Sequence, residues 1–207
     1  MPAQPDLSLE IPLWEGGAQY IAGIDEVGRG ALAGPVTAAA LILPADPAVR
    51  QILAGVRDSK QLTPARRASC GQHLRAVAVA WSVGFVSPQE IDALGIVSAT
   101  RLAMQHAVDG LSVSAQHLLL DYLLLPECAL PQTALVKGDC RSLSIAGASI
   151  LAKTARDSLL TELDEQYPGY GFATHKGYGT PAHLAALARL GPSPIHRRSF
   201  APLKHAS

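Results

Sequence analysis

Aromatic side chains and cysteines are both scarce in this sequence of 207 residues. Aromatics make up 5% of the chain, so its core must be built mainly from Ala, Leu, Val and Ile. The three cysteines, Cys70, Cys128 and Cys140, include no CxxC pair and leave an odd count. This pattern argues against a disulfide framework or a zinc site and favours free thiols in a reducing compartment.

Long apolar runs and targeting signals are also missing. The longest apolar run, residues 31–45, is too short to span a membrane and is interrupted by Gly34 and Pro35. No Lys or Arg precedes Arg29, so the N-terminus resembles neither a signal peptide nor a mitochondrial presequence. We therefore expect a cytoplasmic protein without membrane association. With 48% hydrophobic and 16% charged residues, the composition excludes a disordered polyelectrolyte and suits one large globular domain.

Positive and negative charges balance, but their distribution is uneven. The 17 basic and 17 acidic residues cancel, so the overall basic footprint of a nucleic-acid-binding protein is absent. Residues 168–207 nevertheless contain no acid, four histidines and five basic residues: Lys176, Arg189, Arg197, Arg198 and Lys204. This stretch is either a solvated basic tail or a surface that faces phosphate, and charge alone favours the tail.

Hydrophobic patterns and turn signals predict strands and helices after an irregular lead-in, residues 1–19. Strands are expected over residues 20–27, 35–43, 76–86, 117–122 and 133–136, the last two of them buried. Helices are expected after the capping residues Thr63 and Ser87, over residues 142–165, and from after Thr180-Pro181 to near Gly191. This order predicts an α/β domain, residues 20–167, with a mixed β-sheet flanked by helices. A basic C-terminal helical appendage, residues 168–207, is expected to pack on the same domain.

The densest chemical signal is the segment Gly23-Ile-Asp-Glu-Val-Gly-Arg-Gly30. It has the glycine spacing of a P-loop but lacks the Lys and Ser/Thr that follow, and Pro35 stands where the helix of a dinucleotide fingerprint should run. Asp25 and Glu26 would direct two carboxylates at any bound phosphate, which makes sense only with a divalent cation between them. For an isolated pair, one acid in a structural network and one solvated acid would be the simpler interpretation.

Two further aspartates favour a metal site over that interpretation. Asp121 interrupts the apolar run 118–120, where an unpaired buried carboxylate is costly, and Asp139 follows the next expected strand. Because strand ends at one edge of an α/β sheet form the usual ligand crevice, Asp25, Asp121 and Asp139 are expected to meet there. Oxygen ligands without Cys or His indicate Mg²⁺ or Mn²⁺ rather than zinc.

Seven segments in series resemble the bacterial ribonuclease HII family. They cover nearly the whole chain after Gln19: GIDEVGRGALAGPV at 23–36, DSKQLT at 58–63, LD at 120–121, KGD at 137–139, SIAGASILAKTARD at 144–157, YGFATHKGYGTPAH at 170–183 and HRRSF at 196–200. The resemblance implies a ribonuclease H-like fold and an endoribonuclease that uses Mg²⁺ or Mn²⁺. Such an enzyme cleaves the RNA strand of RNA–DNA hybrids and nicks duplex DNA 5′ of embedded ribonucleotides, the first step of ribonucleotide excision repair. We expect it to act as a monomer.

The resemblance also implies roles for individual residues. The catalytic and metal-binding carboxylates fall on four acids: Asp25, Glu26, Asp121 and Asp139. The glycine turn beside the substrate falls on Gly28, Arg29 and Gly30, and the substrate-sensing tyrosine falls on Tyr178. Two cations about 4 Å apart would clamp the scissile phosphate, leaving 3′-hydroxyl and 5′-phosphate ends. The turn would read the 2′-hydroxyl group, and the Tyr178 ring would stack on the neighbouring deoxyribose.

Several assignments stay open at this level. Phosphate contacts are expected from four residues, each equally interpretable as a solvated surface charge: Lys60, Lys137, Arg197 and Lys204. Asp157 is the alternative fourth metal ligand, although an ion pair with Lys153, four residues earlier on a helix, is its favoured role. Tyr122 stands where the family usually has glycine, which leaves the conformation of that loop open.

Two other classes of protein compete with the ribonuclease interpretation. A nucleic-acid-binding module without catalysis would gain nothing from four acids beside its ligand. Another metal-dependent nuclease on the ribonuclease H-like fold would explain the acids, but not the Gly-Arg-Gly turn together with the segment HKGYGT at 175–180.

Overall fold

A five-stranded mixed sheet forms the centre of the computed structural model, which describes residues 4–56, 59 and 62–205. Its strands, in the spatial order β3-β2-β1-β4-β5, are β1 (Ile21–Val27), β2 (Val36–Ile42), β3 (Ala80–Val86), β4 (His117–Asp121) and β5 (Gln132–Leu135). Strands β1, β2 and β3 pair antiparallel, whereas β4 and β5 run parallel to β1. The predicted mixed α/β sheet is therefore confirmed.

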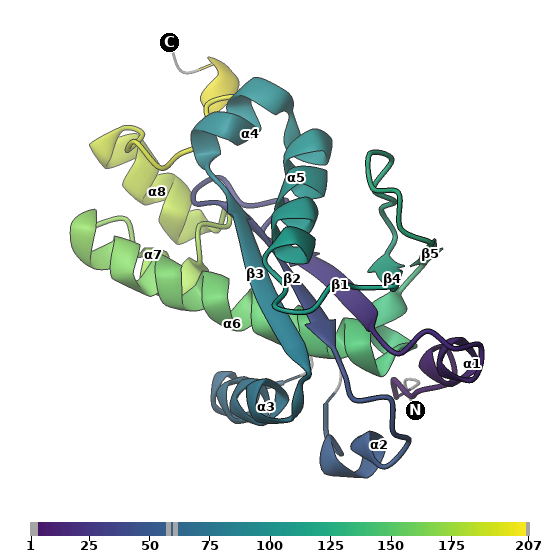
Figure 1. The fold of residues 1–207 in the computed structure, drawn as a ribbon. Coiled ribbons are helices and arrows are strands. Elements are labelled where there is room, and N and C mark those ends of the chain that lie inside the picture. The colour runs from purple at the N-terminus through teal and green to yellow at the C-terminus, as the bar shows by residue number, and fades with distance from the viewer. Residues whose placement is uncertain (1–3, 57–58, 60–61, 206–207) are drawn as a thin grey trace.

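Helices cover both faces of the sheet (Figure 1). They are α1 (Glu10–Glu15), α2 (Val49–Ile52), α3 (Pro64–Val77), α4 (Pro88–Leu94), α5 (Ile96–Asp109), α6 (Leu143–Gln166), α7 (Phe172–His175) and α8 (Pro181–Leu190), with short 3-10 turns η2 (Gly138–Cys140) and η3 (Leu203–His205). Helix α6 packs on one face, against β1 and β2, and α5 packs on the other, against β2 and β3. Each face has its own apolar cluster, rich in Ala, Leu, Val and Ile, as the scarcity of aromatics predicts.

Local signals fixed several helix starts correctly. The Thr63 side chain accepts a hydrogen bond from the backbone N–H of Arg66 at the start of α3. Ser87 and Glu90 form a capping box at the start of α4. Helix α6 begins within one residue of the expected position, after the capping residue Ser142. The three cysteines are free thiols, as expected.

Two strand predictions need correction. Residues 76 and 77 belong to α3, so β3 begins at Ala80, because Ala and Val alone do not stop a helix that still lacks a C-terminal signal. Strand β5 is an edge strand, and three of its four residues are partly or fully exposed, so it is not buried. An apolar run does not reveal whether helices cover both of its faces.

The N-terminal residues are not an irregular lead-in. Helix α1 forms despite Pro12, because a proline in the first turn of a helix removes no required hydrogen bond. Trp14 is buried in the cluster beneath α6. Glu10 is only 1% exposed, and its carboxylate accepts hydrogen bonds from the Ser142 Oγ (2.6 Å) and the Ser144 backbone N–H (3.0 Å). The lead-in therefore anchors the first turn of α6.

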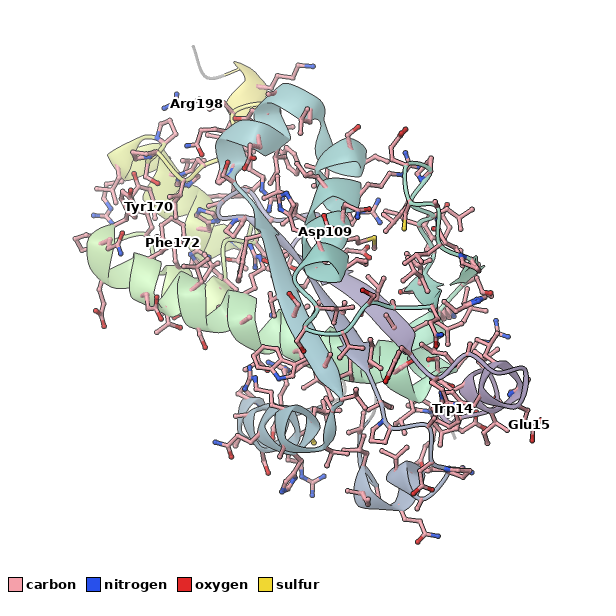
Figure 2. All side chains as sticks on the ribbon, viewed as in Figure 1. Trp14, Glu15, Asp109, Tyr170, Phe172 and Arg198 are labelled. Atoms are coloured by element: carbon pink, nitrogen blue, oxygen red, sulfur yellow. The ribbon has the colours of Figure 1, made fainter. Side chains whose placement is uncertain are left out.

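The C-terminal residues pack beside the far end of α6 through α7. A small cluster around Phe172 and Tyr170 joins them to Leu160 of α6, and Figure 2 shows both rings at the opposite end of the molecule from Trp14. The divisions of the chain at residues 19 and 167 stay predictions. Among the described residues, no helix is long and apolar enough to cross a membrane.

Candidate active site

Three of the four expected carboxylates meet at one edge of the sheet. Asp25 lies near the end of β1, Asp121 is the last residue of β4, and Asp139 lies in η2, which follows β5. Their carboxylate oxygens come within 4.8 Å of one another. They converge because β1 and β4 are parallel and end together: Ile24 pairs with Leu120, one residue before each acid. We call Asp25, Asp121, Asp139 and the adjacent Glu26 the carboxylate site.

The loop after β5 is shaped to bring Asp139 into the carboxylate site. Asp121 accepts a hydrogen bond from the backbone N–H of Gly138 (2.8 Å), which ties the two acidic segments together. Lys137 adopts a left-handed conformation (φ 55°) that turns the chain into η2. Tyr122 is also left-handed (φ 65°). This backbone conformation favours glycine, the residue that is usual at this position in the family that the sequence resembles. Its side chain is 63% exposed, so the substitution leaves Asp121 in place.

Burial and mutual repulsion shape the electrostatics of the carboxylate site. Burial, reinforced by the neighbouring Glu26, raises the pKa of Asp25 well above its usual range, although a hydrogen bond with Ser149 opposes the shift. Burial likewise raises the pKa of Glu26, against the stabilising effect of Arg29. The Oε2 atom of Glu26 is buried and has no hydrogen-bond partner among the described residues. Hard oxygen donors crowded together at this cost fit a divalent cation.

Arg29 and the two glycines form a turn directly beside the carboxylate site. Arg29 donates to Glu26 over 3.1 Å. Gly28 has φ +88°, and a Cβ atom there would lie 2.2 Å from the Nε atom of the buried Arg156, so glycine is required by the protein's own packing. A Cβ atom at Gly30 would meet nothing within 4 Å. The space beside Gly30 is therefore open to a ligand.

Tyr178 is held near this turn by contacts of its neighbour Gly177 and of its own ring. The backbone N–H groups of Leu32 and Ala33 both donate to the carbonyl oxygen of Gly177, at 2.8 and 3.3 Å. The Arg156 guanidinium lies 5.5 Å from the centroid of the Tyr178 ring. These contacts place Tyr178 close to the residues that follow the glycine turn.

Arg197, expected to contact phosphate, is instead buried with no exposed surface. Its Nε and Nη2 atoms donate to the Gly34 carbonyl (3.0 and 2.9 Å), and Nη1 donates to the Arg29 carbonyl (2.9 Å). Its donors are therefore directed at the backbone of the glycine turn rather than at solvent. Of the other expected phosphate contacts, Lys60 lies outside the described residues, whereas Lys137 and Lys204 are exposed.

Asp157 takes part in two ion pairs and is not a member of the cluster of three acids. Its carboxylate accepts from Lys153 (2.7 Å) and from Arg67 (3.2 Å), which agrees with its favoured role as an ion-pair partner. The neighbouring Arg156 was missed, although it stands inside the segment SIAGASILAKTARD that carries the family resemblance. Sequence alone offered no sign that its side chain turns inward.

Three histidines of the C-terminal region, His175, His183 and His196, are buried together and do not form a phosphate-facing surface. The His196 Nδ1 atom accepts the Ser193 backbone N–H (2.9 Å), so His196 carries its proton on Nε2, which faces the His183 Nε2 atom at 3.0 Å. The His183 Nδ1 atom then donates to the Tyr178 carbonyl (3.0 Å). Both imidazoles are therefore neutral. Burial lowers the pKa of His183 and lowers that of His196 to about 4.

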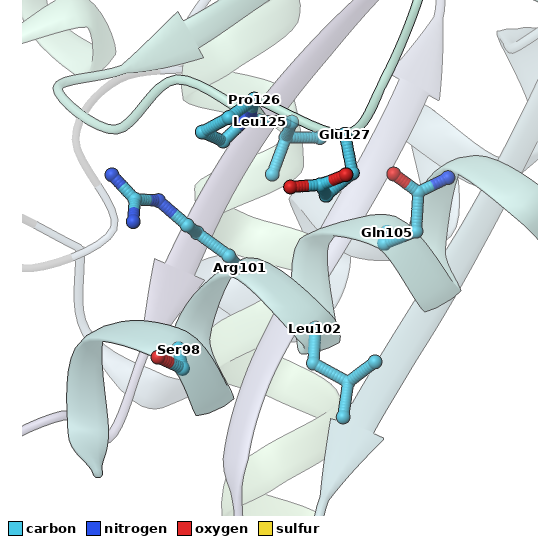
Figure 3. Close-up of a pocket in the computed structure, with 7 residues that line it drawn as sticks. All are labelled: Ser98, Arg101, Leu102, Gln105, Leu125, Pro126 and Glu127. Atoms are coloured by element: carbon cyan, nitrogen blue, oxygen red, sulfur yellow. The ribbon is translucent and has the colours of Figure 1, made fainter. Parts of the chain in front are cut away.

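A separate pocket of about 380 Å³ lies between α5 and the loop after β4 (Figure 3). Its lining includes Arg101, Leu102 and Leu125, and Figure 3 shows the Arg101 and Glu127 side chains at its rim. None of the residues that line it belongs to the carboxylate site or to the glycine turn.

Comparison with known proteins agrees with this geometry. The family model described as Ribonuclease HII matches residues 22–203. Over 203 residues the chain is 57% identical to a ribonuclease HII from Synechococcus sp. (strain JA-3-3Ab), covering 97% of this chain and 90% of the relative.

Two solved structures share the fold. Ribonuclease H2 from Pyrococcus horikoshii OT3 is 25% identical, with a TM-score of 0.76 over 90% of this chain and 96% of that one. The ribonuclease HII of Archaeoglobus fulgidus, solved in complex with PCNA, is 26% identical, with a TM-score of 0.72 over 90% and 95%. Because both sequence and fold agree, the chain belongs to the ribonuclease HII family of endoribonucleases, hydrolases that act on RNA–DNA hybrids.

Proposed function

We propose that this enzyme nicks the strand on the 5′ side of ribonucleotides, in RNA–DNA hybrids and in duplex DNA, with Mg²⁺ or Mn²⁺ held by Asp25, Glu26, Asp121 and Asp139. The observation that supports it is the meeting of three carboxylates within 4.8 Å beside an open glycine turn. When bound, the divalent ions would supply activation of water and charge neutralisation at the scissile phosphate. The proposed setting is the cytoplasm, in the removal of ribonucleotides from DNA by a monomeric enzyme.

The fold holds the carboxylates in fixed positions. Asp25 and Asp121 are carried by adjacent parallel strands, and Gly138 fixes Asp121 through its backbone N–H. Rigid strand ends hold the acids close together against their mutual repulsion, so that they need not be gathered when the cations bind. Arg29 pairs with Glu26 and thereby sets the orientation of that carboxylate at the border with the glycine turn.

Recognition of the ribonucleotide is assigned to the glycine turn and Tyr178. The open space at Gly30 admits a sugar close to backbone N–H groups, and a 2′-hydroxyl group is the feature that distinguishes RNA from DNA. The Tyr178 ring is backed on one side by Arg156, which leaves its surface half-buried and available for stacking. Together these elements would place one ribonucleotide at a defined distance from the carboxylate site.

Three labelled duplexes test the proposal: an RNA–DNA hybrid, DNA with one ribonucleotide, and DNA alone, each incubated with Mg²⁺, Mn²⁺ or EDTA. We expect cleavage of the first two only, dependent on the metal, with a 3′-hydroxyl end on the 5′ side of the ribonucleotide. Cleavage of all-DNA duplex, or equal cleavage in EDTA, would contradict the proposal.

Two variants of Tyr178 separate its proposed roles. Tyr178→Phe keeps the ring and should keep most activity if stacking is the role of this side chain. Tyr178→Ala should impair cleavage at a single ribonucleotide more than cleavage of a long hybrid, because a hybrid offers many registers to the enzyme. Equal losses on both substrates would assign Tyr178 to general binding or folding instead.

A further inference from the structure

Arg156 of α6 is a buried cation held only by backbone carbonyls. It has no exposed surface, and its guanidinium donates to three carbonyl oxygens: Pro35 (Nε, 2.9 Å), Ala33 (Nη2, 3.1 Å) and Lys176 (Nη1, 2.9 Å). None of the ion pairs in the described part of the chain includes it. A buried guanidinium without a carboxylate is costly, and burial lowers its pKa. Simple packing by an apolar side chain would avoid that cost.

The three carbonyls belong to two separate segments, which also pair directly, because the backbone N–H groups of Leu32 and Ala33 donate to the Gly177 carbonyl. Ala33 and Pro35 follow the glycine turn, whereas Lys176 precedes Gly177 and Tyr178. Lys176 is left-handed (φ 52°), a conformation that costs free energy outside glycine, and the hydrogen bond from Arg156 holds it there. The guanidinium therefore joins the end of the glycine turn to the backbone that carries the tyrosine.

Arg156 also packs directly against the glycine turn and the Tyr178 ring. Its Nε atom lies where a Cβ atom on Gly28 would approach to 2.2 Å, so the guanidinium packs immediately against the turn. Its Cζ atom lies over the Tyr178 ring, 5.5 Å from the centroid, in a cation–π arrangement. The Arg156 guanidinium thus lies in contact with both the glycine turn and the Tyr178 ring, where it can fix their relative position.

Arg197 provides an internal comparison. It is equally buried and also donates only to carbonyls, those of Gly34 and Arg29, but its guanidinium stacks on Phe200 (5.2 Å) rather than on Tyr178. The hydrogen bonds of Arg197 therefore go to Gly34 and Arg29, whereas those of Arg156 join the residues after the turn to Lys176, which precedes the tyrosine.

We propose that Arg156 is a positioning residue that sets the spacing between the Gly28–Gly30 turn and the Tyr178 ring, and through it the preference for a ribonucleotide followed by a deoxyribonucleotide. The proposal rests on the function proposed above. A change in this spacing would weaken recognition of the single ribonucleotide, which requires both elements at once. It would affect long hybrids less, since their many registers tolerate poor placement of the ring.

The test compares Arg156→Lys, Arg197→Lys, Tyr178→Ala and the double variant Arg156→Lys/Tyr178→Ala on the two cleavable duplexes. Lys keeps the charge but cannot donate to three carbonyls in one plane. We expect Arg156→Lys to lower the rate at a single ribonucleotide about tenfold, and the rate on a long hybrid less than about threefold. The double variant should discriminate no worse than Tyr178→Ala alone. Arg197→Lys should affect both substrates alike.

Two outcomes would overturn the proposal: equal losses on both substrates for Arg156→Lys, or losses that multiply in the double variant. Amide hydrogen exchange, which needs neither metal nor substrate, tests the proposal in a second way. It applies even if Arg156→Lys does not fold or if the wild type cleaves neither duplex. In Gly28→Ala, the new methyl group must displace the guanidinium, and amide hydrogen exchange at residues 176–178 should then quicken about tenfold. Unchanged exchange there would show that Arg156 does not couple the two segments. Wild-type inactivity by itself would count against the proposed function only.

Discussion

The carboxylate site and the C-terminal region bury ionisable groups in opposite ways. In the carboxylate site, burial raises the pKa values of Asp25 and Glu26, and the neighbouring acids add to this effect. The C-terminal region, after Tyr167, buries His183 and His196 as neutral bases with lowered pKa values, and it satisfies each ring nitrogen internally. The first arrangement has the donor chemistry of a cation site, whereas in the second each ring nitrogen already has a partner within the protein. This contrast separates a site built for a ligand from a support built for stability.

Removing one carboxylate should have the largest effect. Asp25→Asn keeps the shape of the side chain but withdraws a charged oxygen from the carboxylate site, so cleavage should fall by about 10²- to 10³-fold while duplex binding stays within a few fold. Single-turnover rates and a binding titration on the ribonucleotide-containing duplex measure the two quantities. Asp109→Asn, at an exposed aspartate that ends α5, is the matched control and should retain the wild-type rate. An Asp25→Asn variant with more than half of wild-type turnover would refute the assignment.

Divalent metal should stabilise the fold through the same acids. At a concentration about 100-fold above the dissociation constant, binding adds about 2.7 kcal/mol, which raises the melting temperature of a chain this size by about 5–10 °C. Without metal, raised pKa values mean that the folded state binds more protons than the unfolded chain, so stability should increase as the pH falls through the raised pKa of Asp25. Thermal unfolding with and without Mn²⁺, for wild type and Asp25→Asn, checks both. A similar metal-induced shift in the variant would contradict the metal site.

The histidine pair should give the opposite pH dependence. Because the pKa of His196 falls from 6.5 in the unfolded chain to about 4 in the fold, the unfolded chain binds the extra proton, and stability is lost as the pH drops below 6.5. Between pH 7 and pH 5 this amounts to about 2 kcal/mol.

Urea unfolding at the two pH values, compared between wild type and His183→Asn/His196→Asn, isolates this contribution, because the carboxylates are common to both proteins. The variant should show a flatter pH dependence even if it is less stable overall. His73→Asn, at an exposed position of α3, should leave the dependence as in wild type. An equally steep loss in the double variant would mean that other groups cause it.

The smallest effect is expected from the exposed basic residues of the C-terminal region. Arg198 and Lys204 are exposed, while Arg197 is not, so the tail offers fewer phosphate contacts than its sequence suggests. Arg198→Ser/Lys204→Ser should weaken binding to every duplex alike, by a few fold, and reduce the slope of log affinity against log salt by at most about 2. Arg50→Ser, on the exposed surface of α2, is the control. An unchanged slope would leave these residues as solvated surface charges.

Much of the fold was within reach of sequence reasoning because its signals are local. Thr63 and Ser87 are capping residues that act on backbone groups two or three positions away, so the helices after them could be predicted directly. The acids at the ends of apolar runs could be placed at one sheet edge, because parallel strands end together. The resemblance of seven segments to ribonuclease HII then assigned roles that local patterns alone left open.

What sequence reasoning missed lies in contacts between residues far apart in the chain. Glu10 binds Ser144, 134 residues away, and Arg197 binds Gly34, 163 residues away. No periodicity or spacing reports such a pair, so the sequence alone predicts an irregular lead-in and a phosphate contact at Arg197. A charged side chain in a polar segment looks the same whether its donors find water or a carbonyl, and only the folded arrangement decides between the two.

The sequence by itself determined the order of the five strands and the meeting of Asp25, Asp121 and Asp139 at one sheet edge, since these depend on local propensity and residue chemistry. The tertiary structure alone decided which cations face inward. Arg156 and Arg197 turn inward because the buried carbonyls of Ala33, Gly34 and Pro35, which follow the glycine turn, need hydrogen-bond donors. That requirement arises only once the C-terminal region closes over the turn, and no stretch of sequence contains it.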